Sequence, residues 1–94
     1  MTDGEHIEYY DSGAILSKYW YLGGKIHGEY ISYFRSGVIN SISNYIGGKR
    51  SGETIYYYSN GEIYSKYYYI DDKSVSELEW ISYNRNLKLD LILL

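Results

Sequence analysis

The sequence predicts an all-β protein: a single twisted antiparallel meander sheet built from 24-residue β-hairpin repeats, three full and one truncated capping unit. Three observations support this fold class. The chain repeats itself at a fixed spacing. Each repeat contains two stretches rich in aromatic and β-branched side chains with a glycine turn between them. No stretch shows a 3.6-residue apolar period bounded by helix caps.

The repeats align without a gap, residues 4–27 with residues 28–51 and with residues 52–75. The recurring positions are Gly4, Gly28 and Gly52; Ile7, Ile31 and Ile55; Tyr9, Tyr33 and Tyr57; Gly13, Gly37 and Gly61; Ile15, Ile39 and Ile63; Ser17, Ser41 and Ser65; Tyr21, Tyr45 and Tyr69. After a two-residue slip, "EWISYNRNLKLDLI" (79–92) matches "EYISYFRSGVINSI" (29–42), with Leu87 in place of the turn glycine. We therefore expect one domain over residues 1–94 with units 4–27, 28–51, 52–75 and 78–94, the last being a terminal cap.

The C-terminal unit is expected to continue the sheet, because "LKLDLILL" has the pattern of an apolar edge strand. Unpaired edges promote association between chains. Two arrangements therefore stay open: Leu91 to Leu94 fold over the sheet as a cap, or the strand pairs with a second chain in a homodimer.

The hairpin turns "DSG", "RSG" and "SNG" predict three-residue loops with the glycine in the left-handed conformation. A two-residue loop would force Ser12 and Ser36 to positive φ. Strict alternation from such a loop predicts two faces. One face would collect Ile7, Tyr9, Ile15, Ser17, Tyr21 and their equivalents, nearly all of them repeated. The other would collect the variable positions His6, Glu8, Leu16 and their equivalents, and we expect this variable face to carry function.

The Gly-Glu opening, the "Y-Y-x-x-G-x-I" pattern and the closing "G-G-K-x-x-G" resemble MORN-type repeats. The resemblance is to the MORN-repeat-variant form found in bacterial and viral proteins that are labelled antitoxin-like, and it covers roughly residues 4–92. It implies an elongated antiparallel meander with one hairpin per unit, acting as a scaffold or binding module without catalytic residues. The departures are Leu87 and the "DDK" of residues 71–73, where the other units have "GGK".

Composition excludes several classes of function. The chain has no cysteine, which excludes a thiolate metal site and a cysteine nucleophile, and its two histidines lack ligand spacing. Its recurring serines form a ladder rather than a triad, so no catalytic, metal or cofactor site is expected. A net charge of −3 disfavours nucleic acid. We find no signal-peptide pattern and no apolar stretch long enough for a membrane span, which predicts a cytoplasmic protein without a membrane partner.

The candidate binding site is a group of aromatic side chains expected on the variable face, with one concentrated spot of positive charge. Its members are Tyr30, Tyr56, Tyr64, Tyr68, Trp20 and Trp80, with Lys49 and Arg50 as the cations. Tyrosine and tryptophan anchor many protein interfaces. The alternative is that these rings cover one another, or a second copy of the chain, because a single-layer sheet must bury some surface.

These observations predict a non-enzymatic protein–protein interaction module, a small inhibitor or antitoxin-like protein that binds and occludes another protein. The alternatives are a phage- or virus-encoded inhibitor, for example of a nuclease effector, and a peripheral lipid-binding scaffold.

Overall fold

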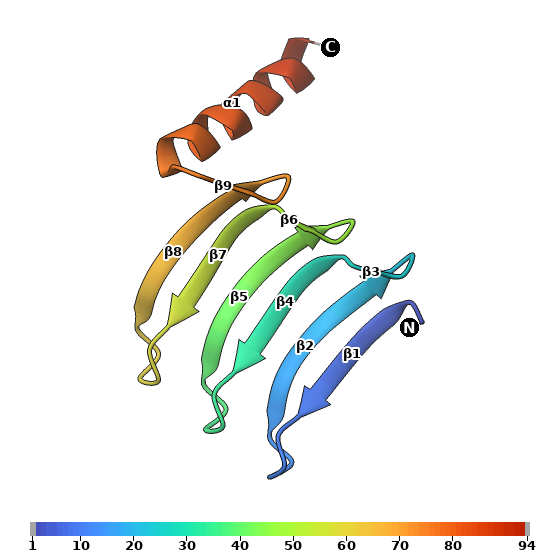
Figure 1. Cartoon of the computed structure of the whole chain (residues 1–94). Helices are drawn as coiled ribbons and strands as arrows, with labels where there is room; N and C mark the ends of the chain where they lie inside the picture. The colour runs from blue at the N-terminus through green and yellow to red at the C-terminus, as the bar shows by residue number, and fades with distance from the viewer. Residues whose placement is uncertain (1, 94) are drawn as a thin grey trace.

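The computed structural model describes the backbone of residues 2–93 and the side chains of residues 2–86. It contains one open sheet of nine strands and one helix (Figure 1). The elements are β1 (Gly4–Tyr9), β2 (Ile15–Leu22), β3 (Lys25–Ile26), β4 (Gly28–Tyr33), β5 (Ile39–Ile46), β6 (Lys49–Arg50), β7 (Gly52–Tyr57), β8 (Ile63–Ile70), β9 (Lys73–Val75) and α1 (Glu77–Leu93). The strand order is β1-β2-β4-β5-β7-β8-β9, every pairing is antiparallel, and β3 and β6 pair with β2 and β5. The predicted meander of hairpin repeats is confirmed.

Each hairpin closes through the three-residue loop that its sequence predicts. In the first, the Gly13 amide donates to the Tyr10 carbonyl at 2.9 Å, and the Tyr10 amide donates to the Ala14 carbonyl at 2.8 Å. The third loop residue takes a φ of +91° at Gly13 and Gly61 and +93° at Gly37. Only glycine adopts this conformation without a steric cost, which explains its recurrence.

A one-residue shift of register follows each loop, and the sequence pattern did not predict it. Tyr9 pairs with Ile15, but the preceding residue Glu8 pairs with Ser17, so that Leu16 forms a β-bulge. The same shift occurs in the second and third hairpins. Because side chains alternate along a strand, the bulge exchanges the faces of every later residue of the second strand. The predicted faces are therefore wrong beyond the bulge.

The bulge divides each unit between two faces that differ from the predicted ones. One, here the tyrosine face, carries His6, Glu8, Ser17, Tyr19, Tyr21 and their equivalents. The other, here the isoleucine face, carries Glu5, Ile7, Tyr9, Ile15, Lys18, Trp20 and their equivalents. Repeated and variable positions occur on both, so the variable positions do not form a face of their own.

The best-buried side chains lie on the tyrosine face, which is the nearest thing to a core in this single-layer sheet. Ser17 is 3% exposed, Tyr19 is 6% exposed and Thr54 is 1% exposed. Aromatic rings on adjacent strands cover this face: the Tyr19 ring stacks on the Tyr30 ring of the next unit, with centroids 5.1 Å apart and planes 9° apart. The first two repeats are thus joined by ring stacking as well as by strand pairing.

The predicted continuation of the sheet into a C-terminal edge strand is wrong, because residues 77–93 form the helix α1. Ser76 caps its first turn: the Glu79 amide donates to Ser76 Oγ at 3.1 Å, and Ser76 Oγ donates to Glu79 Oε1 at 3.2 Å. Two acidic residues in the first turn, Glu77 and Glu79, stabilise the helix through the favourable interaction of their negative charge with the helix dipole. The edge strand on which the expected homodimer depended is therefore absent. The expected packing of the Leu91–Leu94 side chains lies outside the described residues.

We expect Ser76→Ala to loosen the start of α1, because it removes the acceptor for the Glu79 amide. Loss of such a cap costs about 1 kcal/mol of helix stability. Circular dichroism at 222 nm should show reduced helix content at 25 °C with the β signal preserved. Ser82→Ala, an exposed substitution within the same helix, is the matched control and should leave helix content unchanged or raise it. An equal loss of helix content in both variants would contradict the capping role of Ser76.

Candidate functional site

The residues predicted to form one binding surface are divided among different parts of the molecule. Tyr30 and Tyr56 lie on the tyrosine face, whereas Trp20 and Tyr68 lie on the isoleucine face, opposite Glu5 and Glu53. Tyr64 occupies the bulge of the third hairpin, and Trp80 belongs to α1. The expectation of a single aromatic cluster is wrong, and the bulge is the reason.

Three of the predicted aromatic residues serve internal packing. The Tyr30 ring lies between the Tyr19 ring and the Tyr45 ring, whose centroid is 6.2 Å away. Tyr68 and Trp80 pack against each other at 5.1 Å and hold α1 to β8. These three residues therefore follow the alternative prediction, in which the aromatic rings cover one another instead of a partner.

Trp20 is half-exposed on the isoleucine face, with 48% of its surface accessible. A shallow hollow beside it is lined by Glu5, Lys18, Glu29 and Ile31. Trp20 therefore remains accessible, but on the face opposite Tyr56.

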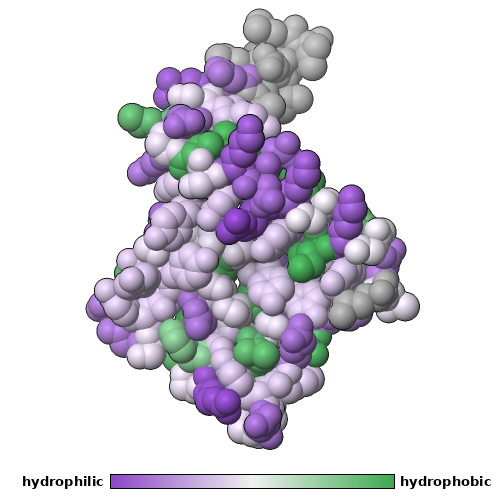
Figure 2. Space-filling model, in the orientation of Figure 1, coloured by the Kyte–Doolittle hydropathy of each residue, from purple (hydrophilic) through white to green (hydrophobic). Residues whose placement is uncertain are grey.

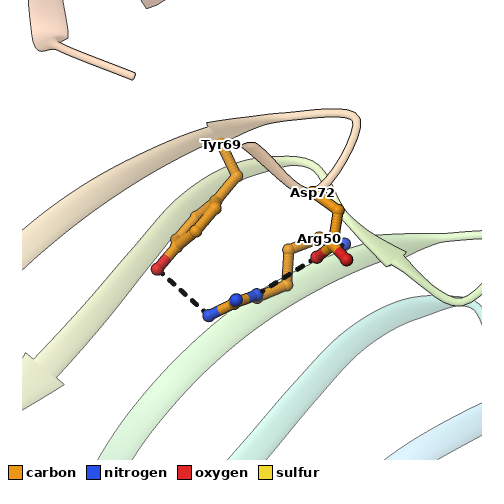
Figure 3. Close-up of polar contacts among 3 residues, drawn as sticks. All are labelled: Arg50, Tyr69 and Asp72. Carbon is orange, nitrogen blue, oxygen red and sulfur yellow. Dashed lines mark hydrogen bonds and ion pairs between the residues drawn. The ribbon is translucent and has the colours of Figure 1, made fainter. Parts of the chain in front are cut away.

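Lys49 and Arg50 are ion-paired rather than unneutralised cations, and Figure 3 shows the contacts of Arg50. Lys49 Nζ lies 3.4 Å from Asp71 Oδ1, and Arg50 Nε lies 3.4 Å from Asp72 Oδ1. The Arg50 guanidinium also stacks on the Tyr69 ring, 4.1 Å from its centroid, and donates to the Tyr69 hydroxyl at 3.0 Å. The expected spot of positive charge is therefore largely neutralised by the next unit.

The two aspartates that pair with these cations occupy an unusual turn. Asp71 and Asp72 have φ of +50° and +71°, where the corresponding turns of the other units use paired glycines. Aspartate tolerates this conformation better than most residues, at some cost in backbone strain. The Asp72 amide also donates to the Arg50 carbonyl at 2.8 Å. The departure from "GGK" to "DDK" thus supplies the carboxylates that join the second and third units.

Four exposed tyrosines gather in the third unit, and we call them the tyrosine patch: Tyr56, Tyr58, Tyr64 and Tyr67. Their exposed fractions are 36%, 50%, 62% and 46%. The Tyr56 and Tyr67 rings meet edge to face at 5.9 Å, and the Tyr58 and Tyr64 rings do so at 5.0 Å. Because Tyr56 and Tyr58 are two residues apart along one extended segment, they project to the same side and bring the two pairs together.

The tyrosine patch is exposed because the described chain continues after the third unit as a helix rather than as a further hairpin. Tyr19 is the equivalent of Tyr67 in the first unit, and it is buried because Tyr30 of the following unit stacks on it. After the third unit the chain forms α1, which extends away from the corner of the sheet at β8 and β9 (Figure 1). Position in the repeat array, rather than residue type, makes Tyr67 accessible.

Tyr56 and Tyr64 belong to the candidate site predicted from the sequence, whereas Tyr58 and Tyr67 do not. The signal that could have found them is the Ser76–Glu79 capping pattern, which predicts that the next unit is a helix. With no strand to follow, the last tyrosines of the repeat are expected to be uncovered.

A hydrogen bond on the tyrosine face shifts the ionisation of one tyrosine. The Tyr19 hydroxyl donates to Glu8 Oε1 at 2.6 Å. This bond, with burial and the charge of Glu8, raises the pKa of Tyr19 to about 12 from its ordinary 10.0. Burial also raises the pKa of Tyr45, in part offset by the positive charge of Arg50. Both shifts favour the neutral ring in the folded protein.

Among residues 2–86, no three histidine, aspartate or glutamate side chains come together in an arrangement that could hold a metal ion. Within the described chain, no helix is both long and apolar enough to cross a membrane.

Comparison with known proteins identifies the repeat. Residues 26–46 and 50–71 match the family model of the MORN repeat variant. These two segments contain β4 and β5 of the second unit and most of β7 and β8 of the third. Neither a curated protein nor a solved structure gives a significant match to the chain.

We expect Arg50→Ala to lower the free energy of unfolding by about 1 kcal/mol, because it removes the stacking on Tyr69 and the ion pair with Asp72. In a domain of this size, that corresponds to a fall in Tm of about 4–8 °C. In a double-mutant cycle with Asp72→Ala, the two effects should be less than additive. Lys25→Ala, which removes an exposed cation in β3, is the control and should cost less. If the losses of unfolding free energy in the two single variants add up to the loss in the double variant, Arg50 and Asp72 are not coupled.

The stability of the fold should fall as the pH rises from about 10 through about 12, because Tyr19 keeps its proton in the folded state while the unfolded chain releases it. Below pH 10 the contribution of Tyr19 to the stability of the fold is fully present. Glu8→Gln should move the pKa of Tyr19 back toward 10.0, measured by NMR titration of the ¹³Cζ resonance. Glu5→Gln, on the opposite face, is the control and should leave the pKa of Tyr19 unchanged. A Tyr19 resonance that titrates near 10 in the unaltered protein would contradict the hydrogen bond.

Proposed function

The chain carries MORN-variant repeats, which are generally protein- or membrane-binding modules, and we propose that it is a non-enzymatic module that binds another protein through the tyrosine patch. One observation carries the proposal: Tyr56, Tyr58, Tyr64 and Tyr67 lie together and stay exposed at the end of the repeat array. Tyrosine offers a large, rigid contact area at a low cost in conformational entropy, together with a polar hydroxyl.

The chemistry of the surface favours a protein over a membrane. A net charge of −3 opposes binding to anionic lipid. In the view of Figure 2, apolar side chains form separate patches among pale and hydrophilic ones rather than a continuous apolar surface. A set of half-exposed rings with hydroxyl groups suits a mixed polar and apolar protein interface.

We further propose that binding occludes a working surface of the partner, as a small inhibitor or antitoxin-like protein does. A phage- or virus-encoded inhibitor, for example of a nuclease effector, would act in the same way. The architecture supports occlusion, because a sheet end that presents aromatic side chains can cover a site on the partner without any chemistry of its own.

The remaining predicted contacts, Trp20, Lys49 and Arg50, lie away from the centre of the proposed interface. Trp20 faces away from the tyrosine patch, so a partner must wrap around the sheet to touch both. Lys49 and Arg50 would have to exchange Asp71 and Asp72 for partner carboxylates. We therefore place Tyr56 and Tyr64 at the centre of the interface and these three residues outside it.

A photo-crosslinking amino acid at position 64 should form a covalent adduct with the partner in cells that express the chain, because this ring is among the most exposed in the patch. The same amino acid at position 9, an equally exposed tyrosine on the isoleucine face, is the matched control and should not. Tyr56→Ala combined with Tyr58→Ala should weaken binding of the identified partner more than tenfold, since interface anchors contribute about 2 kcal/mol each.

The measurement is the Kd of the purified pair, with circular dichroism to confirm that the fold is intact. Adducts that form from position 9 and not from position 64 would move the interface to the isoleucine face and contradict the proposal.

A further inference from the structure

The joints between units follow one pattern of strand pairing. In the first joint, between β2 and β4, Ser17 pairs with Ser32 and Lys18 with Ile31. In the second joint, between β5 and β7, Ser41 pairs with Tyr56 and Ile42 with Ile55. The first joint continues on the tyrosine face with the stacking of Tyr19 on Tyr30. Each unit therefore receives the strand of the next unit at the same two positions, and the ring of Tyr19 adds a third position in the first joint.

The third unit presents these three positions without a strand on them. The equivalents are Ser65, Lys66 and Tyr67 of β8. On the side away from β7, β8 pairs only through residues 68–70, with β9. Across the described residues, nothing pairs with residues 63–67 on that side. Ile63, Tyr64 and Tyr67 are correspondingly 51%, 62% and 46% exposed.

We propose that the protein partner binds as an extended strand added antiparallel to residues 63–67 of β8, with an aromatic side chain stacked on Tyr67. The inference rests on the proposed function and specifies its mode. An open strand edge supplies backbone donors and acceptors to an incoming strand. Side-chain pockets along the edge then select the sequence.

The internal joint also gives the sequence pattern of the occupant. In the first joint, the residues opposite Ser17, Lys18 and Tyr19 are Ser32, Ile31 and Tyr30. The partner strand should therefore carry an aromatic residue, then an aliphatic residue, then a small polar residue. The aromatic residue would stack on Tyr67 and extend the tyrosine patch, while the aliphatic residue would cover the stem of Lys66 on the isoleucine face.

Register decides between a separate strand and a second copy of the chain. Val75 pairs with Tyr68 at the place that His27 occupies opposite Trp20 in the first joint. A second copy that added its β1 in the same register would need to place its Asp3 where Val75 already lies. Asp3 is held to its own sheet, accepting from the Gly23 amide at 2.8 Å. A free strand can leave the edge at Tyr67, and a second copy in this register cannot.

The test uses full-length chain labelled with ¹⁵N and the capped peptide GEYISY, the sequence of residues 28–33 that fills the equivalent place in the first joint. We expect saturable NMR shift changes and slowed amide exchange within residues 63–67. Tyr67→Ala should weaken binding at least tenfold, and so should Tyr67→Leu, which keeps apolar volume without the ring. Tyr9→Ala should have no effect. A peptide with alanine in place of its first tyrosine should bind at least tenfold more weakly, and a backbone N-methylated peptide should not bind.

Several outcomes would overturn strand addition: no binding at millimolar peptide, shifts confined to β1, or equal binding by the N-methylated peptide. Self-association of the chain with protection of residues 63–67 would assign the edge to a second copy and also overturn it. These failures are distinguishable from failure of the proposed function. Cross-linking from position 64 together with unprotected residues 63–67 in the complex would mean that the tyrosine patch binds its partner without strand addition.

Discussion

A one-residue shift of register in every hairpin decides which side chains of this protein meet. With Glu8 opposite Ser17 rather than Leu16, the second strand turns Tyr19 and Tyr21 to the same face as His6 and Glu8. Without the shift, the rings of alternate strands would lie on opposite faces, and the stacking of Tyr19 on Tyr30 could not form. The bulge is therefore the feature on which both the aromatic core and the joints between units depend.

Stacked tyrosines let a single layer of strands bury enough surface to be stable. A one-layer sheet has no second sheet or helix layer against which to pack, so each unit is covered by its neighbour along the array. Tyr19 is 6% exposed where a unit follows it, and Tyr67 is 46% exposed where none does. The same tyrosine position is structural inside the array and exposed at its end, where we propose that it contributes to the partner interface.

Sequence reasoning recovered the parts of the fold that depend on local chemistry. The glycines of "DSG", "RSG" and "SNG" specify left-handed loop residues, and the spacing of the repeats specifies the meander. The bulge was missed because Leu16, Asn40 and Tyr64 share no side-chain type that marks an extra residue. The ion pairs of Lys49 and Arg50 were missed because their partners, Asp71 and Asp72, lie one repeat later and meet them only through the stacking of turns.

The C-terminal segment carried two conflicting signals, and their conflict explains where the candidate site lies. Residues 80–83 keep the aromatic, aliphatic, serine and tyrosine order of residues 30–33, which favours a strand. Ser76 and Glu79 favour a capped helix, and Leu87 removes the glycine that a hairpin would need. Once the helix forms, no strand among the described residues pairs with residues 63–67 on the side away from β7, and Tyr67 stays 46% exposed. A sequence that breaks its own repeat at one place is expected to do so for function.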